Sequence, residues 1–163
     1  MPISQENVIS QIKKYSNQME IKQIVERSAH INYTYKVTPD VYYSFQRCSN
    51  DYNPLHTDAA FAAKKGFGKV VVYGNVLNAF VSHFVGMLLP TRDVMILGQN
   101  ISFRKPVFLN DELELEAKME KCTEEIGLIT YALKFRKKSD GGGKNELIAN
   151  GHVQISVIND IEI

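Results

Sequence analysis

The chain has 163 residues, 44% of them hydrophobic, which is the size of one domain with a single packed core. Nineteen basic against eighteen acidic residues give a formal charge of +1 at pH 7, so there is no broad electrostatic reason to expect nucleic acid or an anionic membrane as a partner. We therefore expect a small molecule or another protein.

Neither cysteine chemistry nor a membrane segment is indicated. Cys48 and Cys122 lie far apart and show no C-x-x-C or Cys/His spacing, which disfavours a disulfide framework or a zinc site. The N-terminus, MPISQENVISQIKK, lacks the apolar core of a signal peptide, and the longest apolar tract, VLNAFVSHFVGMLLP, is too short to cross a membrane. A soluble, cytoplasmic protein is the prediction.

Residues 1–30 are predicted to form a partly helical N-terminal extension before a single domain over residues 31–163. Four apolar residues follow Ser4, a possible helix cap, at spacings of four, three and four: Val8, Ile12, Tyr15 and Met19. This spacing predicts an amphipathic helix over residues 5–17.

The domain is predicted to open with a strand and a short helix. INYTYKV, residues 31–37, is rich in β-branched and aromatic residues, as strands are. Thr38 and Pro39 then suit the cap and first turn of a helix over residues 39–48.

Two further helices are predicted in the middle of the chain. The alanines of DAAFAAKKGF favour a helix, and Gly66 suits the position just past its end. GNVLNAFVSHFVGMLLP, residues 74–90, is apolar on most sides, which is typical of a helix buried almost all round, and Pro90 ends it.

The last part of the chain alternates apolar and polar residues with the period of strands. Four successive strands are predicted in the stretches VMILGQNISF, ELELEAKME, LITYALKFR and LIANGHVQISV. KKSDGGGKN is the most obvious hairpin between the last two. Antiparallel strands after one long buried helix predict an α+β fold, with a curved sheet wrapped around that helix. Open sheet edges in such a fold invite pairing with a second copy.

The motif SNDYNPLHTD, residues 49–58, places Asp51 and His56 five positions apart. A helix would direct the two side chains about 140° apart, and Pro54 disfavours a helix there in any case. A loop can instead turn both toward one point, where a carboxylate and an imidazole can hold a water molecule and move its proton. The other interpretation is an ordinary polar turn, since Asn, Asp and Pro are turn residues.

A second landmark favours chemistry at this motif. VVVYGNVL brings an apolar, strand-like run to Gly74, at the start of the predicted buried helix. The free N–H of that glycine and the positive end of the helix would stabilise negative charge on a carbonyl oxygen. A water-holding pair and such a donor are the parts needed to add water across a C=C bond conjugated to a thioester.

Several stretches together resemble the MaoC-like, (R)-specific enoyl-CoA hydratases of the hot-dog fold. They are the run from Phe45 through SNDYNPLHTD, Gly66-Phe67, VVVYGNVL and ISFRKPVFLNDEL, and the similarity extends from about residue 31 to residue 157. The resemblance implies a catalytic dyad of Asp51 and His56, an oxyanion N–H at Gly74 and a supporting Ser82. It also implies a homodimer or dimer of dimers with joined sheets, acyl-CoA bound near the interface, and no metal or redox cofactor.

Three positions depart from the family pattern. Asn50 stands where glycine is usual, Tyr73 where histidine is usual, and Asn75 where an apolar residue is usual. Tyr73 can narrow the acyl pocket, present its hydroxyl to the substrate or pack; we favour packing or pocket shape over proton transfer. Together with Gly74, Ser82 and Asn53, Tyr73 completes the predicted substrate-binding set.

Other polar residues are given structural interpretations. His83 is expected to be a core histidine, and Ser82 can simply bond to the carbonyl one turn back. Arg104 and Lys105 can meet the phosphates of a CoA tail, but charges at a strand end are usually solvated, so they stay outside the predicted site. No phosphate-binding loop, dinucleotide fingerprint or G-x-S-x-G elbow is present.

The leading hypothesis is therefore the reversible hydration of trans-2-enoyl-CoA to (R)-3-hydroxyacyl-CoA. Asp51 would act as base toward the water, and His56 would orient it and share the proton transfer. Two alternatives remain open: hydrolysis of acyl-CoA thioesters, and a non-catalytic protein that binds acyl thioesters.

Overall fold

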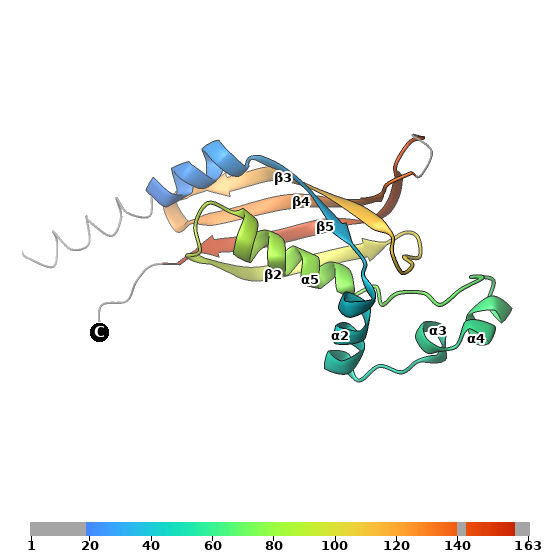
Figure 1. The fold of residues 1–163 in the computed structure, drawn as a ribbon. Coiled ribbons are helices and arrows are strands. Elements are labelled where there is room, and N and C mark those ends of the chain that lie inside the picture. The colour runs from blue at the N-terminus through green and yellow to red at the C-terminus, as the bar shows by residue number, and fades with distance from the viewer. Residues whose placement is uncertain (1–18, 140–142, 159–163) are drawn as a thin grey trace, which may run out of the picture.

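The computed structural model describes residues 19–139 and 143–158 and places an antiparallel sheet beneath one long helix (Figure 1). The strands are β1 (His30–Lys36), β2 (Val94–Phe103), β3 (Glu112–Thr123), β4 (Leu128–Lys137) and β5 (Glu146–Val157), in the spatial order β1-β3-β4-β5-β2. The helices are residues 19–28, α2 (Pro39–Ser49), α3 (Pro54–Thr57), α4 (Ala59–Lys64) and α5 (Val76–His83). A π-helical turn, Phe84–Leu88, continues α5, and a 3₁₀ turn, Glu124–Ile126, joins β3 to β4.

The predicted α+β fold is confirmed, because every predicted strand of the sheet forms. On β4, Ile129, Tyr131, Leu133 and Phe135 are all buried, as the alternation requires. The helix predicted over residues 5–17 lies outside the described residues, and the division of the chain at residue 30 stays a prediction. The described helix 19–28 contributes Ile21 and Ile24 to the core.

The long helix differs from the prediction in two ways. Residues 70–73 do not form a strand before it; Val72 donates a single backbone hydrogen bond to Val107 at 2.8 Å, outside the sheet. The apolar run is therefore buried without joining the sheet. The helix is also not buried all round within one chain, because Ala79, Ser82 and Met87 are exposed on its outer side.

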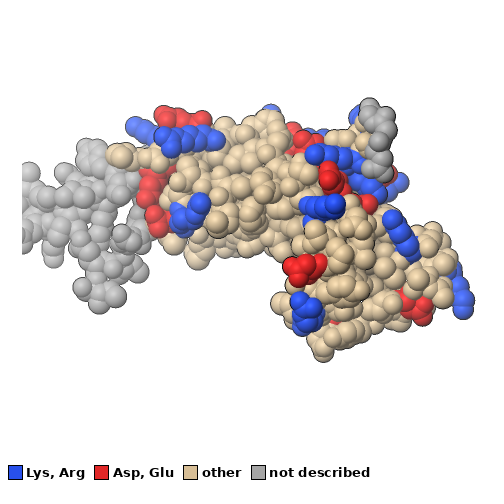
Figure 2. Space-filling view, in the orientation of Figure 1, with Lys and Arg blue, Asp and Glu red and all other residues tan. Residues whose placement is uncertain are grey.

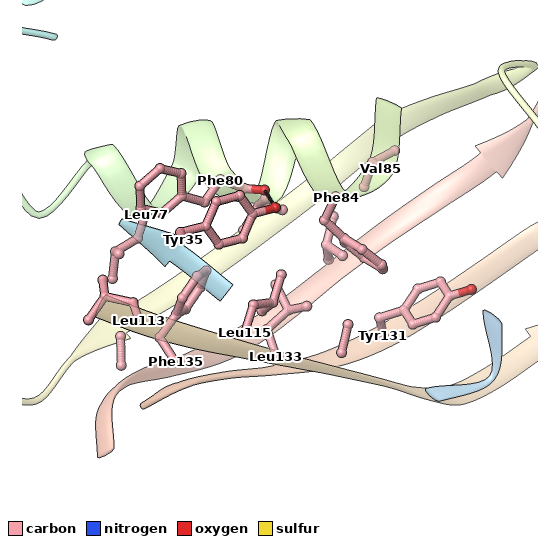
Figure 3. Packing of buried hydrophobic residues seen from close by; sticks show 14 of the residues in the cluster. Tyr35, Leu77, Phe80, Phe84, Val85, Leu113, Leu115, Tyr131, Leu133 and Phe135 are labelled. Carbon is pink, nitrogen blue, oxygen red and sulfur yellow. Dashed lines mark hydrogen bonds between the residues drawn. The ribbon is translucent and has the colours of Figure 1, made fainter. Parts of the chain in front are cut away.

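The core lies between the inner side of α5 and the inner face of the sheet (Figure 3). Tyr35 of β1 stacks on Phe80 of α5 with ring centroids 4.2 Å apart, and its hydroxyl donates to the Phe80 carbonyl at 3.0 Å. Further along, Phe84 meets Tyr131 edge to face at 5.2 Å. These contacts fix α5 across the strands, so the beginning of the helix is held at one end of the sheet.

The segment that carries α2, α3 and α4 lies beside the beginning of α5, away from the sheet (Figure 1). Thr38 caps α2 by accepting from the N–H of Val41 at 3.3 Å, with Pro39 in the first turn, as predicted. Gly66 has φ 86° just beyond α4, as its predicted position at a helix end requires. None of the described helices has the length and apolarity needed to span a membrane, and the cytoplasmic location stays a prediction.

On the outer face of the sheet, Glu116 of β3 joins β1 and β4 through its carboxylate. It lies 2.6 Å from Arg136 Nη1 and 3.6 Å from His30 Nε2. The hydrogen bond from Arg136 lowers the pKa of the Glu116 carboxyl. The charged form of Glu116 is therefore favoured in the folded chain.

We expect Glu116→Gln to lower the free energy of unfolding by roughly 0.2–1 kcal/mol at pH 7, the range of partly exposed ion pairs. A folded pKa below the unfolded value means that this stabilisation is present above the unfolded pKa of about 4.3 and is lost as the pH falls through the folded value. Urea unfolding at pH 7 and at pH 3.5 measures the effect. Glu125→Gln, in the exposed turn after β3, is the control. The prediction would be contradicted if the difference in free energy of unfolding between the two variants were the same at pH 3.5 as at pH 7.

Candidate active site

The loop between α2 and α3 is closed by its own polar side chains. Asn50 has φ 52° and ψ 31°, a left-handed conformation that Asn and Gly adopt more readily than other residues. Asp51 Oδ1 accepts from the N–H of Asn53 at 2.9 Å, and Asn53 Oδ1 accepts from the N–H of Leu55 at 2.9 Å, which caps α3. The interpretation of the motif as a turn is therefore correct for its backbone, and it explains why glycine can be replaced at position 50.

His56 is fixed in one tautomer by a backbone carbonyl. Its Nδ1 lies 2.7 Å from the carbonyl oxygen of Val71, which can only accept, so Nδ1 carries a proton. In the neutral ring Nε2 is then the nitrogen with a free lone pair. Nε2 has no hydrogen-bond partner in the described parts of the chain.

His56 and Gly74 line the same pocket, which has a volume of about 340 Å³ and mostly apolar walls. This volume is in the range of small-molecule sites. The other lining residues are Phe67, Val71, Val72, Leu77, Phe103, Arg104, Lys105, Pro106, Val107 and Ile148. Two of the predicted site residues, 18 positions apart in sequence, are thus brought to one cavity.

Gly74 lines this pocket, and its backbone N–H donor is unused in the described chain. Its N–H meets no acceptor within residues 19–139 and 143–158, and it lies in the turn directly before α5. A Cβ at position 74 would lie 3.2 Å from the ring of Phe103, closer than ordinary packing. Glycine therefore leaves room beside the N–H that a larger residue would take up.

Asp51 is half-buried but is not among the residues that line the pocket. No hydrogen bond or ion pair in the described chain joins its carboxylate to the imidazole of His56. Both residues instead contact Tyr73: its hydroxyl donates to the backbone carbonyl of Asp51 at 2.7 Å, and its ring lies 4.1 Å from that of His56. The joint action of Asp51 and His56 on one water stays a prediction.

Tyr73 is only 3% exposed, and its hydroxyl also accepts from the side-chain amide of Gln46 at 3.0 Å. Its proton is engaged by the Asp51 carbonyl, so the hydroxyl is not offered to a ligand in this arrangement. This geometry supports the packing interpretation of Tyr73 and disfavours a contact between its hydroxyl and substrate.

The remaining members of the predicted substrate-binding set, Asn53 and Ser82, lie outside the pocket. The Asn53 side chain is used by the helix cap described above. Ser82 is exposed two turns along α5 from Gly74, roughly 12 Å at the rise of an α-helix, and its hydroxyl forms no hydrogen bond with another described residue. Roles for these two residues are therefore not supported by the pocket geometry of one chain.

Sequence reasoning missed Gln46, for which no pattern gave a signal, and set aside Arg104 and Lys105. The FRKP stretch did point to these two cations, and both line the pocket. Arg104 Nε donates to Asn150 Oδ1 at 2.9 Å, and Lys105 Nζ lies 3.6 Å from Glu146. They place positive charge at a cavity that is otherwise mainly apolar.

His83 has a structural partner, as predicted, and His152 also has one. His83 Nδ1 lies 2.9 Å from the hydroxyl of Tyr35, and His152 lies 3.2 Å from Glu120 on the outer face. In the parts of the chain that the structure describes, no three His, Cys, Asp or Glu side chains gather as a metal site would require.

Comparison with known families identifies the class of protein. The sequence model of the family described as MaoC like domain matches residues 20–150, which is most of the chain and runs from the first described helix into the beginning of β5. This chain therefore belongs to the MaoC-like domain family. The predictions of this family and of a hydratase or dehydratase type of enzyme are confirmed at this level.

Individual relatives agree with this assignment. A protein named (R)-specific enoyl-CoA hydratase from Aeromonas caviae is 38% identical over 92 residues, which cover 56% of this chain and 69% of that protein. The solved structure of the (R)-hydratase from A. caviae has a TM-score of 0.66 at 30% identity and covers 78% of this chain and 93% of that one. An R-hydratase from Pseudomonas aeruginosa has a TM-score of 0.68 at 26% identity and covers 82% and 84%. The predicted hot-dog fold is thereby confirmed.

Proposed function

We propose that this chain catalyses the reversible addition of water to trans-2-enoyl-CoA, giving (R)-3-hydroxyacyl-CoA. The observation that carries the proposal is the mainly apolar pocket lined by both His56 and Gly74. An imidazole able to accept a proton at Nε2 and a free backbone N–H belong to one cavity, which is the pairing that the reaction needs. Kinship with a protein named (R)-specific enoyl-CoA hydratase supports the substrate class and the product configuration.

In the proposed reaction, the Asp51 carboxylate and Nε2 of His56 hold a water molecule between them. Asp51 takes one proton from the water while the water oxygen forms a bond to the β-carbon of the enoyl group. The π electrons of the C=C bond move toward the thioester carbonyl, whose oxygen accepts a hydrogen bond from the Gly74 N–H. His56 orients the water and shares the proton transfer, and the proton taken up by Asp51 is then given to the α-carbon, which completes the addition. The atoms balance without a metal or a redox cofactor.

The proposal is tested by mixing the purified protein with a short trans-2-enoyl-CoA and following the loss of enone absorbance. The expected result is a protein-dependent decrease that approaches an equilibrium, and regain of absorbance from the (R)-3-hydroxyacyl-CoA but not from the (S) isomer. Absence of turnover with short, medium and branched enoyl-CoA substrates would overturn the proposal.

A thiol-release assay with a saturated acyl-CoA separates this reaction from thioester hydrolysis. A hydratase has no double bond to act on in that substrate, so no free thiol is expected. Release of thiol without hydration of the enoyl-CoA would instead assign the pocket to a thioesterase.

We also propose that two copies of the chain join their sheets at β2. This strand pairs only with β5 among the described residues, and it exposes Met95 and Leu97 by 49% and 50%, whereas the opposite edge strand, β1, is mostly polar. The centre of the face that carries α5 shows few charged side chains (Figure 2). Sedimentation at equilibrium is expected to give twice the mass of one chain, and a monomer at micromolar concentration would contradict the proposal.

A further inference from the structure

Four segments of the chain meet at the hydroxyl and the ring of Tyr73. The side-chain amide of Gln46, on α2, donates to the Tyr73 hydroxyl at 3.0 Å, and that hydroxyl donates to the carbonyl of Asp51 at 2.7 Å. The Tyr73 ring lies 4.1 Å from the His56 imidazole, tilted by 37°. Tyr73 also immediately precedes Gly74 in the chain.

The hydroxyl of Tyr73 has no proton left for another partner. It donates its only proton to the Asp51 carbonyl and accepts the Gln46 amide proton, in a position where solvent reaches only 3% of the residue. A buried hydroxyl with defined donor and acceptor partners holds a fixed orientation. The direction of both bonds is fixed, because the Asp51 carbonyl can only accept and the Gln46 amide N–H can only donate; Gln46 holds the hydroxyl oxygen from the other side.

The ring of Tyr73 is held as firmly as its hydroxyl. Phe45 and Tyr42 each place a ring centroid 5.3 Å from it, and the Tyr42 hydroxyl donates to the backbone carbonyl of His56. The imidazole of His56 is therefore confined between the Tyr73 ring on one face and the Val71 carbonyl at Nδ1.

We propose that the Gln46–Tyr73 pair is the device that sets Asp51 in position relative to His56 and Gly74. This inference rests on the hydration reaction proposed above and deepens it. No contact within the described chain joins the side chains of Asp51 and His56 directly, whereas Tyr73 touches both residues and is covalently bonded to Gly74. Tyr73 is a positioning residue: it acts through Asp51 and His56 and does not touch the substrate.

The expected effect follows from the sensitivity of proton transfer to geometry, because misplacement by about 1 Å can cost about 100-fold in rate. Tyr73→Phe keeps the ring against His56 and removes only the hydroxyl. We expect kcat for enoyl-CoA hydration to fall by about 10–100-fold, while KM changes by less than about twofold, because the pocket walls are unchanged. Gln46→Leu leaves the hydrogen bond from the Tyr73 hydroxyl to the Asp51 carbonyl but removes the amide that donates to this hydroxyl. A smaller fall in kcat, about 3–10-fold, is therefore expected.

The pathway through Asp51 is tested by a double variant. In an Asp51→Asn background, Tyr73→Phe is expected to lower kcat by less than about twofold further, because the group that it positions is already disabled. A full additional loss would show that Tyr73 acts independently of Asp51. Tyr43→Phe is the matched control; this tyrosine is 50% exposed on the same helix as Gln46 and is expected to leave kcat and KM unchanged.

Hydrogen exchange on the same variants decides the inference separately from activity. In Tyr73→Phe, the amides of Asn53, Leu55 and His56 are expected to exchange at least about fivefold faster, with strand amides of β4 unchanged. Two results would overturn the inference. One is unchanged exchange in the loop of Tyr73→Phe. The other is a kcat of Tyr73→Phe equal to that of a wild-type protein that does hydrate enoyl-CoA. If the wild-type protein hydrates no enoyl-CoA, the proposed function fails, and faster loop exchange in Tyr73→Phe would still show that Tyr73 holds the loop around Asp51 in place.

Discussion

Replacing His56 by alanine is expected to lower kcat for enoyl-CoA hydration by about 10²–10⁴-fold, the usual contribution of a positioned acid–base group. The physical reason is the bond from Nδ1 to the Val71 carbonyl, which leaves Nε2 as the only imidazole nitrogen able to accept a proton in the neutral ring. Asp51→Asn is expected to have an effect of similar size, because an amide cannot take a proton from water. Initial rates of enone loss at saturating substrate measure both.

A second histidine provides the control for this experiment. His152 lies on the outer face of the sheet, beside Glu120, and His152→Ala is expected to leave the rate unchanged. Circular dichroism of each variant establishes that it is folded. If folded His56→Ala or Asp51→Asn retained the wild-type rate, the assignment of that residue to the chemistry would be wrong.

Phe84→Ala is expected to lower the free energy of unfolding by about 3–5 kcal/mol, the cost of removing a large aromatic side chain from a packed core. Phe84 is fully buried and meets Tyr131 edge to face at 5.2 Å, where α5 passes into its π-helical turn. Removing the ring leaves a cavity between the helix and the sheet. A loss of this size is a large fraction of the stability of an ordinary domain, about 5–15 kcal/mol.

Urea unfolding measures this change, and Ile126→Ala is the matched control. Ile126 is 64% exposed in the turn between β3 and β4, so its truncation is expected to change stability by less than about 0.5 kcal/mol. A loss below about 1 kcal/mol for Phe84→Ala would mean that α5 moves to fill the space.

Alternation of apolar and polar residues predicted the sheet because each strand buries only one face. Leu113, Leu115 and Ala117 show this on β3, where all three are buried and the residues between them are not. Residues 70–73 are an apolar, strand-like run without this alternation, and there Val71 and Val72 are buried without joining the sheet. An apolar run reports burial, and the partner that buries it is determined by the tertiary arrangement.

The parts of the candidate site that depend on neighbouring residues in the sequence were predictable. Turn residues identified the loop around Asp51, and the glycine before a buried helix identified an unused donor. The role of Gln46 was not predictable, because its contact with Tyr73 spans 27 positions and follows no periodicity. The pocket walls likewise come from segments that only the fold brings together.

The left-handed turn at Asn50 changes what this departure from the family pattern means for the protein. Asparagine and glycine both adopt that backbone conformation, so the two are interchangeable there in a way that a valine or leucine would not be. The position has a conformational requirement that asparagine meets, with an exposed side chain outside the pocket. Asn50 therefore gives no reason to expect a lost activity. Under the proposed function, differences in acyl-chain preference between this protein and its relatives should be sought instead in the residues that line the pocket with Gly74.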